Sequence, residues 1–249
     1  MSRSVLLLAI VSAIAVAYPV PTGVWTFDDP SNALAGIDGN DMVNEPGHVY
    51  EVGAIEGCPG DRALLLGAGR TVNLSFSPHT GEDATVCLEM EASPGEGGVE
   101  LLRMFRAKAS GYEFGLRFGS SAPRGRRLVL LLDSIGAFYT VSDGLPPSRL
   151  FHVCSQWSRG ADGSREGIIV RNADISMLGR HQSRSPESLA SASTPLERWT
   201  LGGLPSTPES PLVRVSSITT WDRVLTREEL QSVYGNSKGD CGMRLRKEL

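Results

Sequence analysis

The stretch ATVCLEMEA, residues 84–92, decides the fold because apolar and polar side chains alternate along it. Its valine, central leucine and methionine fall on one face of an extended strand, whereas Cys87, Glu89 and Glu91 fall on the other. A strand with one apolar and one polar face is typical of an antiparallel sheet that packs against a second layer.

The stretch FHVCSQWS, residues 151–158, alternates in the same way. Phe151 and Val153 share one face, and His152, Cys154 and Gln156 share the other. A histidine, a cysteine and a tryptophan this close together also fit a reactive site or a metal site, so the stretch needs the rest of the chain to be interpreted.

The remaining chain consists of short apolar runs separated by Gly, Pro, Asp and Ser, which indicates many strands and turns. The runs predicted as strands are 24–27, 63–67, 71–76, 99–107, 112–118, 127–133, 137–143, 166–175, 198–203 and 214–221, with a glycine turn joining the second and third. The Ser-rich residues 180–195 lack periodicity and are predicted to form a surface loop. The pattern predicts an all-β antiparallel sandwich of the jelly-roll type.

One helix is predicted near the C-terminus, within TREELQSVYG at residues 226–235. Thr226 is a suitable N-cap, and Glu229, three residues later, completes a capping box. Leu230, Val233 and Tyr234 give the helix an apolar face, and Gly235 can end it.

The N-terminal residues 1–17 have the pattern of a secretory signal peptide: Arg3, an apolar run, and an Ala-Val-Ala cleavage site ending at Ala17. We therefore expect a secreted protein whose residues 18–249 form a single domain. The chain ends in RKEL, which resembles an endoplasmic reticulum retrieval signal but has Lys247 where that signal has an acid.

The net charge of −4 provides no global basic field for nucleic acid, and no later stretch is apolar enough to predict a membrane span. The chain has four cysteines, Cys58, Cys87, Cys154 and Cys241. In an oxidising compartment they predict two disulfides in one of three connectivities. A zinc site would need more closely spaced pairs.

FHVCSQWS resembles the pentraxin signature His-x-Cys-x-Ser/Thr-Trp-x-Ser/Thr. His152, Cys154 and Trp157 are in register with it, while Gln156 and Arg159 stand where the family has hydroxyl residues.

Two further segments are similar to the same family. ATVCLEMEAS (84–93) resembles the strand that holds the partner cysteine, and WDRVLTREEL (221–230) resembles a late strand that enters a short helix. The N-terminal half fits the broader laminin G-like, concanavalin A-like jelly rolls better, with GVWTFDD and GDRALLLGAGRTVNLSF as its closest parts.

This resemblance implies a Cys87–Cys154 disulfide, and with it a second disulfide between Cys58 and Cys241. It also implies where a pentraxin calcium site would lie. Ser110 and Gly111 occupy one part of that site, and Glu209 is the only acid in the other. Calcium takes six to eight oxygen ligands, so we expect the calcium site to be lost and no cofactor to be bound.

Other candidate sites were weighed against plainer interpretations. Glu89 and Glu91 are on one strand face, as a glycosidase carboxylate pair would be, but a solvated strand face explains them better. The acids and amides of residues 28–41 favour Asx turns over a calcium loop. The arginines of PRGRR (123–127) fit either a polyanion site or a solvated hairpin tip. Asn73 begins an N-glycosylation sequon.

Three functions remain for the chain. The first is a non-catalytic, secreted binding module that recognises a glycan or an extracellular protein surface through loops at the sandwich edge. The second is a structural or adhesive extracellular protein without sugar specificity. The third is a glycosidase-like enzyme that uses Glu89 and Glu91. The sequence does not specify the oligomeric state.

Overall fold

The fold was analysed in a computed structural model of the chain. The structure describes residues 18–29, 31–36, 41–42, 50–55, 58–67, 71–74, 83–93, 97–106, 112–121, 125–132, 137–141, 150–159, 165–171, 181–183, 196–202 and 212–235.

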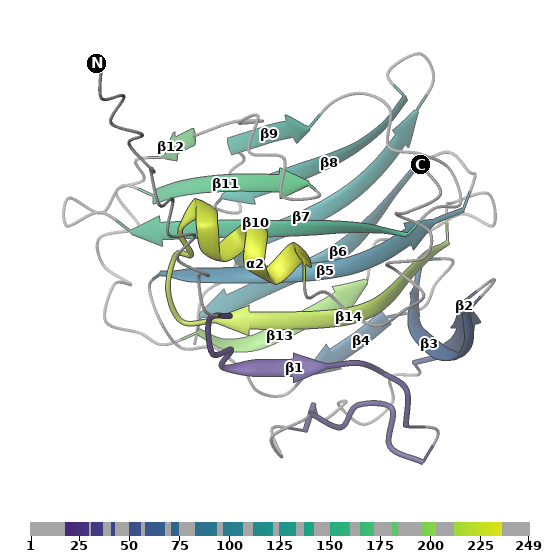
Figure 1. Ribbon diagram of the computed structural model, residues 1–249. Coiled ribbons are helices and arrows are strands. Elements are labelled where there is room, and N and C mark those ends of the chain that lie inside the picture. The colour runs from purple at the N-terminus through teal and green to yellow at the C-terminus, as the bar shows by residue number, and fades with distance from the viewer. Residues whose placement is uncertain are drawn as a thin grey trace, which may run out of the picture.

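Two antiparallel sheets form the domain (Figure 1). Among the described residues the larger sheet has eight strands, and β1 pairs with β14 beside the main order. In spatial order the strands are β12 (His181–Ser183), β11 (Arg165–Arg171), β10 (Phe151–Arg159), β5 (Ala84–Ala92), β14 (Val213–Trp221), β3 (Cys58–Leu66) and β2 (Val52–Ile55), with β1 at Gly23–Trp25.

The smaller sheet has six strands in the described part of the chain. Its order is β4 (Thr71–Leu74), β13 (Leu196–Gly202), β6 (Gly97–Arg106), β7 (Tyr112–Ser121), β8 (Gly125–Leu132) and β9 (Ala137–Val141). Consecutive strands from β6 to β9 pair with their neighbours in sequence, which is the simplest way to extend an antiparallel sheet.

The main core lies between the two sheets and is built from the apolar faces that alternation predicts. Val86, Leu88 and Met90 of β5 lie in it together with Phe118 of β7 and Trp199 of β13, all fully buried. The predicted antiparallel sandwich is therefore confirmed.

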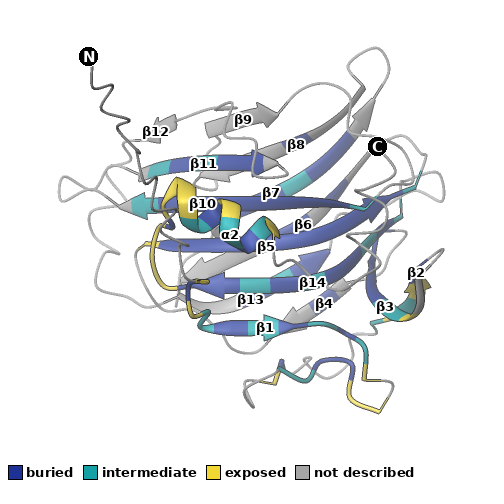
Figure 2. Cartoon of the chain, in the orientation of Figure 1, coloured by how far each residue is buried: buried dark blue, intermediate teal, exposed yellow. Residues whose placement is uncertain are grey.

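A third layer covers the outer face of the larger sheet. Helix α2 (Arg227–Gly235) lies across β10 and β5 (Figure 1) and buries Leu230 and Val233. Consequently every residue of β5 is buried, on both faces of the strand (Figure 2). The outer face of β5 is thus an interior surface.

One local prediction was wrong, and another left the sheet of each strand open. Strands β3 and β4 follow each other along the chain as expected, but β3 belongs to the larger sheet and β4 to the smaller one. The Ser-rich segment was predicted to be loop throughout, yet its residues 181–183 form β12, which pairs with β11. Alternation identifies a strand but does not say which sheet it joins, and three residues are too few to produce a pattern.

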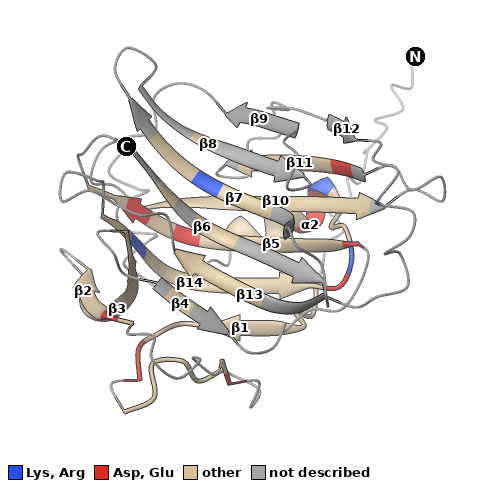
Figure 3. Ribbon diagram, turned by 180° about the vertical axis from the view of Figure 1, so that it is seen from behind, with Lys and Arg blue, Asp and Glu red and all other residues tan. Residues whose placement is uncertain are grey.

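Charged residues of both signs are scattered over the described elements rather than gathered in one patch (Figure 3). Within the described residues, no helix combines the length and apolar character needed to cross a membrane.

Candidate functional site

The polar residues of β5 and β10 meet in three directly opposed pairs beneath α2. In the register of the two strands, Gln156 faces Thr85, Cys154 faces Cys87, and His152 faces Glu89. None of these six side chains is more than 4% exposed. Buried polar groups cost free energy unless they are partnered. The contacts that these six side chains make are therefore the first place to look for a functional site.

The central pair is a disulfide. Cys87 and Cys154 are bonded to each other, as the family resemblance implied. Both ring nitrogens of His152 lie 3.8 Å from the Cys154 sulfur. The His152 ring also lies near Tyr234 of α2, and the centres of the two rings are 5.7 Å apart. The histidine therefore packs between the disulfide and the helix.

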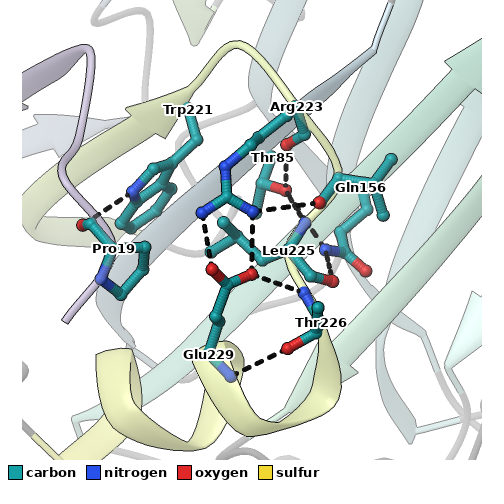
Figure 4. Close-up of polar contacts among 9 residues, drawn as sticks. Pro19, Thr85, Gln156, Trp221, Arg223, Leu225, Thr226 and Glu229 are labelled. Atoms are coloured by element: carbon teal, nitrogen blue, oxygen red, sulfur yellow. Dashed lines mark hydrogen bonds and ion pairs between the residues drawn. The ribbon is translucent and has the colours of Figure 1, made fainter. Parts of the chain in front are cut away.

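The pair formed by Thr85 and Gln156 anchors the connection that leads from β14 into α2 (Figure 4). The Thr85 hydroxyl donates to the carbonyl oxygen of Arg223 at 2.8 Å and accepts from the backbone N–H of Leu225 at 3.2 Å. The Gln156 amide donates to the Thr85 hydroxyl at 3.1 Å and to the carbonyl oxygen of Leu225 at 2.9 Å.

This anchor gives a structural role to Gln156. The Gln156 side chain reaches the backbone of the connection that leads into α2. Sequence reasoning missed Thr85 as a functional partner of the helix. The available signal was its spacing of two residues from Cys87, which puts both side chains on one face.

The capping box predicted for α2 is present. The backbone N–H of Glu229 donates to the Thr226 hydroxyl at 3.2 Å, and the backbone N–H of Thr226 donates to the Glu229 carboxylate at 2.9 Å. Arg223 adds a bidentate ion pair to the same carboxylate, with N–O distances of 2.6 and 2.7 Å (Figure 4). The hydrogen bonds from Arg223 lower the pKa of Glu229 from 4.5 to about 2.

We expect Glu229→Gln to lower the free energy of unfolding by about 1 kcal/mol at neutral pH. The value is modest because the Arg223 side chain is 48% exposed and solvent screens such pairs. A lowered pKa means that the carboxylate stabilises the fold above its ordinary pKa of 4.5 and loses this effect as the pH falls toward about 2. Urea unfolding of both proteins should show a difference that shrinks with acidification.

Glu228→Gln is the matched control for this experiment, since Glu228 is an exposed acid in the same first turn of α2. It should change stability by less than about 0.5 kcal/mol. A pH-independent difference for Glu229→Gln would contradict the role given to the ion pair.

Glu89 and Glu91 are not on a solvated strand face, so that interpretation was wrong. Glu89 is 1% exposed and Glu91 is 6% exposed. The Ser216 hydroxyl lies 3.4 Å from the Glu89 carboxylate, and Arg214 lies 3.9 Å from that of Glu91. The two carboxylates do share one strand face, but that face is buried along β5.

The N-terminal segment of the described chain is fixed to the last strand. The indole N–H of Trp221 donates to the carbonyl oxygen of Pro19 at 3.1 Å (Figure 4), and the ring of Tyr18 lies 6.5 Å from that of Trp221. The Thr22 backbone N–H then donates to Thr220 at 2.8 Å, where the pairing of β1 with β14 begins.

The acid-rich segment after β1 forms turns in its described part. One Asp29 oxygen accepts from the backbone and hydroxyl of Ser31, and these bonds lower the pKa of Asp29. An oxygen of Asp41 accepts from the backbone N–H of Gly36, and Asp28 accepts from that of Arg62. The interpretation as Asx turns is therefore confirmed at Asp29.

Several predicted positions lie outside what the structure describes. They are residues 1–17, Asp38, Asn40, Ser110, Gly111, Arg124, Glu209, Cys241 and residues 246–249, together with the side chains of Cys58, Asn73, Arg126 and Arg127. The second disulfide and the calcium position therefore stay predictions.

The comparisons with known proteins support the fold alone. No protein-family model and no curated protein sequence matches the chain. A structure of botulinum neurotoxin type C, whose uptake by cells is dependent upon interaction with two ganglioside molecules, superposes with a TM-score of 0.59 at 11% identity, over 87% of this chain and 51% of that one. The binding domain of botulinum neurotoxin DC in complex with SialylT gives 0.59 at 10% identity, over 87% and 50%.

A Trypanosoma rangeli sialidase in complex with sialic acid is also similar, with a TM-score of 0.56 at 13% identity over 88% of this chain and 33% of that one. This chain therefore spans about half the length of the toxin chains and a third of the sialidase chain. Binding domains and an enzyme thus share its β-sandwich fold, which does not decide between those functions.

Proposed function

We propose that this chain is a secreted, non-catalytic recognition module that binds glycans, without calcium, through loops at the edges of the sandwich. The observation that carries the proposal is the burial of the opposed pairs on β5 and β10. The cysteines form a disulfide, Thr85 and Gln156 anchor the connection into α2, and His152 packs against that helix. These contacts stabilise the fold. Recognition is then left to the loops, where proteins of this architecture commonly place it.

The structural neighbours support the glycan as the ligand. The two toxin structures are described with gangliosides and with SialylT, and the sialidase with sialic acid. Another toxin structure holds rat synaptotagmin II, so a protein ligand also fits the fold. We choose the glycan because three of the similar structures concern sugars, and sialylated glycans are the first class to test.

A glycan array probed with the secreted protein, with and without EDTA, tests this function. We expect binding to a subset of glycans, sialylated ones included, that EDTA does not change. Binding to no glycan would contradict the proposal and would favour the structural or adhesive alternative. Binding that EDTA abolishes would instead contradict the loss of the calcium site.

The glycosidase alternative rests on Glu89 and Glu91 and on the similarity to a sialidase. We expect no release of sugar from a fluorogenic sialoside. If hydrolysis occurs, Glu89→Gln and Glu91→Gln decide whether these carboxylates cause it, with Glu228→Gln as the control and circular dichroism to show that each variant is folded. Hydrolysis that both glutamine variants abolish would replace the binding proposal by the enzymatic one.

We expect Asn73 to carry an N-linked glycan when the protein is secreted from eukaryotic cells. Strand β4 is at the edge of the smaller sheet and pairs only with β13 in the described sheet order. Val72 is buried in the core, and Thr200, the pairing partner of residue 73 on β13, is partly exposed. Asn73→Gln and Ser75→Ala should both remove the same glycosidase-sensitive mass. An unchanged mass would contradict the assignment.

A further inference from the structure

Three side chains capable of binding a transition metal gather on the outer face of the larger sheet. Cys87, His152 and Cys154 each offer one ligand atom, and these atoms all lie within 4.8 Å of one another. We name these residues the Cys–His group. In the oxidised chain its sulfurs are bonded together, and a disulfide provides no thiolate for a metal.

We propose that the Cys–His group binds a zinc-class divalent ion when its disulfide is reduced. The site would then have two states, a covalent cross-link under oxidising conditions and a metal centre under reducing ones. The metal would replace the lost bond between β5 and β10, so the same two strands stay joined in both states.

The distances fit a single tetrahedral ion. With Zn–S near 2.3 Å and Zn–N near 2.0 Å, the ligand atoms of such an ion lie about 3.5–3.8 Å apart. The nitrogens of His152 already lie 3.8 Å from the Cys154 sulfur. The two sulfurs must move apart once their bond is broken, which requires rotation of the two cysteine side chains.

The chemistry balances with a dithiol as the reductant. Two electrons and two protons pass from the dithiol to the protein disulfide, which yields the thiols of Cys87 and Cys154 and a cyclic disulfide of the reductant. A divalent ion then displaces both thiol protons and takes the lone pair of neutral His152. Two thiolates and an imidazole are a donor set that zinc favours.

The scaffold holds the three ligands in place from several sides. Cys87 and Cys154 face each other in the strand register, and His152 is two residues from Cys154 on the same face. The ring of Tyr234 packs against His152 from α2. Glu89 faces His152 across the strands, which puts a carboxylate next in register to the group. Ligands supported in this way need little rearrangement on binding.

The test uses the full-length secreted protein with Cys58→Ser and Cys241→Ser, so that only the cysteines of the Cys–His group remain. The protein is reduced anaerobically with a water-soluble phosphine, which is then removed, and is titrated with Co²⁺ as a spectroscopic stand-in for zinc. We expect thiolate-to-cobalt charge-transfer bands and the visible bands of a tetrahedral ion, saturating at an equimolar ratio. The oxidised protein should show neither.

His152→Gln should weaken Co²⁺ binding by at least about 10-fold, whereas His181→Gln, on β12, should not change it. If reduction unfolds the protein, the same titration followed by circular dichroism should show metal-dependent refolding that His152→Gln impairs. The proposal is overturned if the reduced protein gives no cobalt bands and no refolding, or if His152→Gln binds cobalt as tightly as the parent protein.

Discussion

Replacing Cys87 with alanine and Cys154 with valine is expected to lower the free energy of unfolding by about 4 kcal/mol. The disulfide joins residues 67 positions apart, and the loop-entropy model gives about 4 kcal/mol for a loop of this length. The alanine–valine combination keeps the buried volume close to that of the two sulfurs, so the change reports the cross-link more than a cavity. A loss of this size is a large part of the 5–15 kcal/mol that is typical of a folded domain.

Urea unfolding measured by far-ultraviolet circular dichroism gives the difference directly. The Cys58→Ser, Cys241→Ser protein under reducing conditions is the control, because it loses only the Cys87–Cys154 bond and keeps both of these side chains. A loss below about 1 kcal/mol in the double variant would show that the strand pairing and α2 hold β5 and β10 without the bond.

Trp221→Ala is expected to cost about 3–5 kcal/mol, as the truncation of a large buried aromatic side chain does. Trp221 is 1% exposed and belongs to the apolar cluster between the larger sheet and α2. It also donates its hydrogen bond to Pro19. The substitution therefore loosens the N-terminal segment and the helix together.

Trp221→Phe separates these two effects, because phenylalanine keeps most of the apolar contact and loses the N–H donor. We expect it to cost about 1–2 kcal/mol, near the value of one hydrogen bond with some lost packing. Hydrogen exchange should speed up in β1 and α2 of the alanine variant before it does so in β6 and β7. Equal losses in the two variants would mean that the hydrogen bond, not the packing, dominates.

The sequence predicted much of the fold because the chain follows a simple rule over most of its length. Residues 84–92 alternate strictly, and β5 has these bounds in the structure. The capping box at Thr226 and Glu229 was equally local, and both of its hydrogen bonds are present. Signals of this kind depend only on neighbouring residues, so tertiary contacts do not obscure them.

Predictions about the surroundings of a strand were less successful for a physical reason. Alternation puts Glu89 and Glu91 on the face away from the sandwich core, and this is where they lie, but it does not show that this face of β5 is buried. Likewise, the anchor between Thr85 and Leu225 joins residues 140 positions apart. No local pattern contains a contact of that range.

The position of β14 has a consequence for how the protein is made. This strand, residues 213–221, lies between β5 and β3 in the larger sheet and also pairs with β1. During synthesis on the ribosome, β1, β3 and β5 therefore each have an unpaired edge until β14, the last described strand, has been made. Unpaired edges invite association with other chains, so we expect a nascent chain of this protein to be prone to association until its C-terminal fifth has been synthesised.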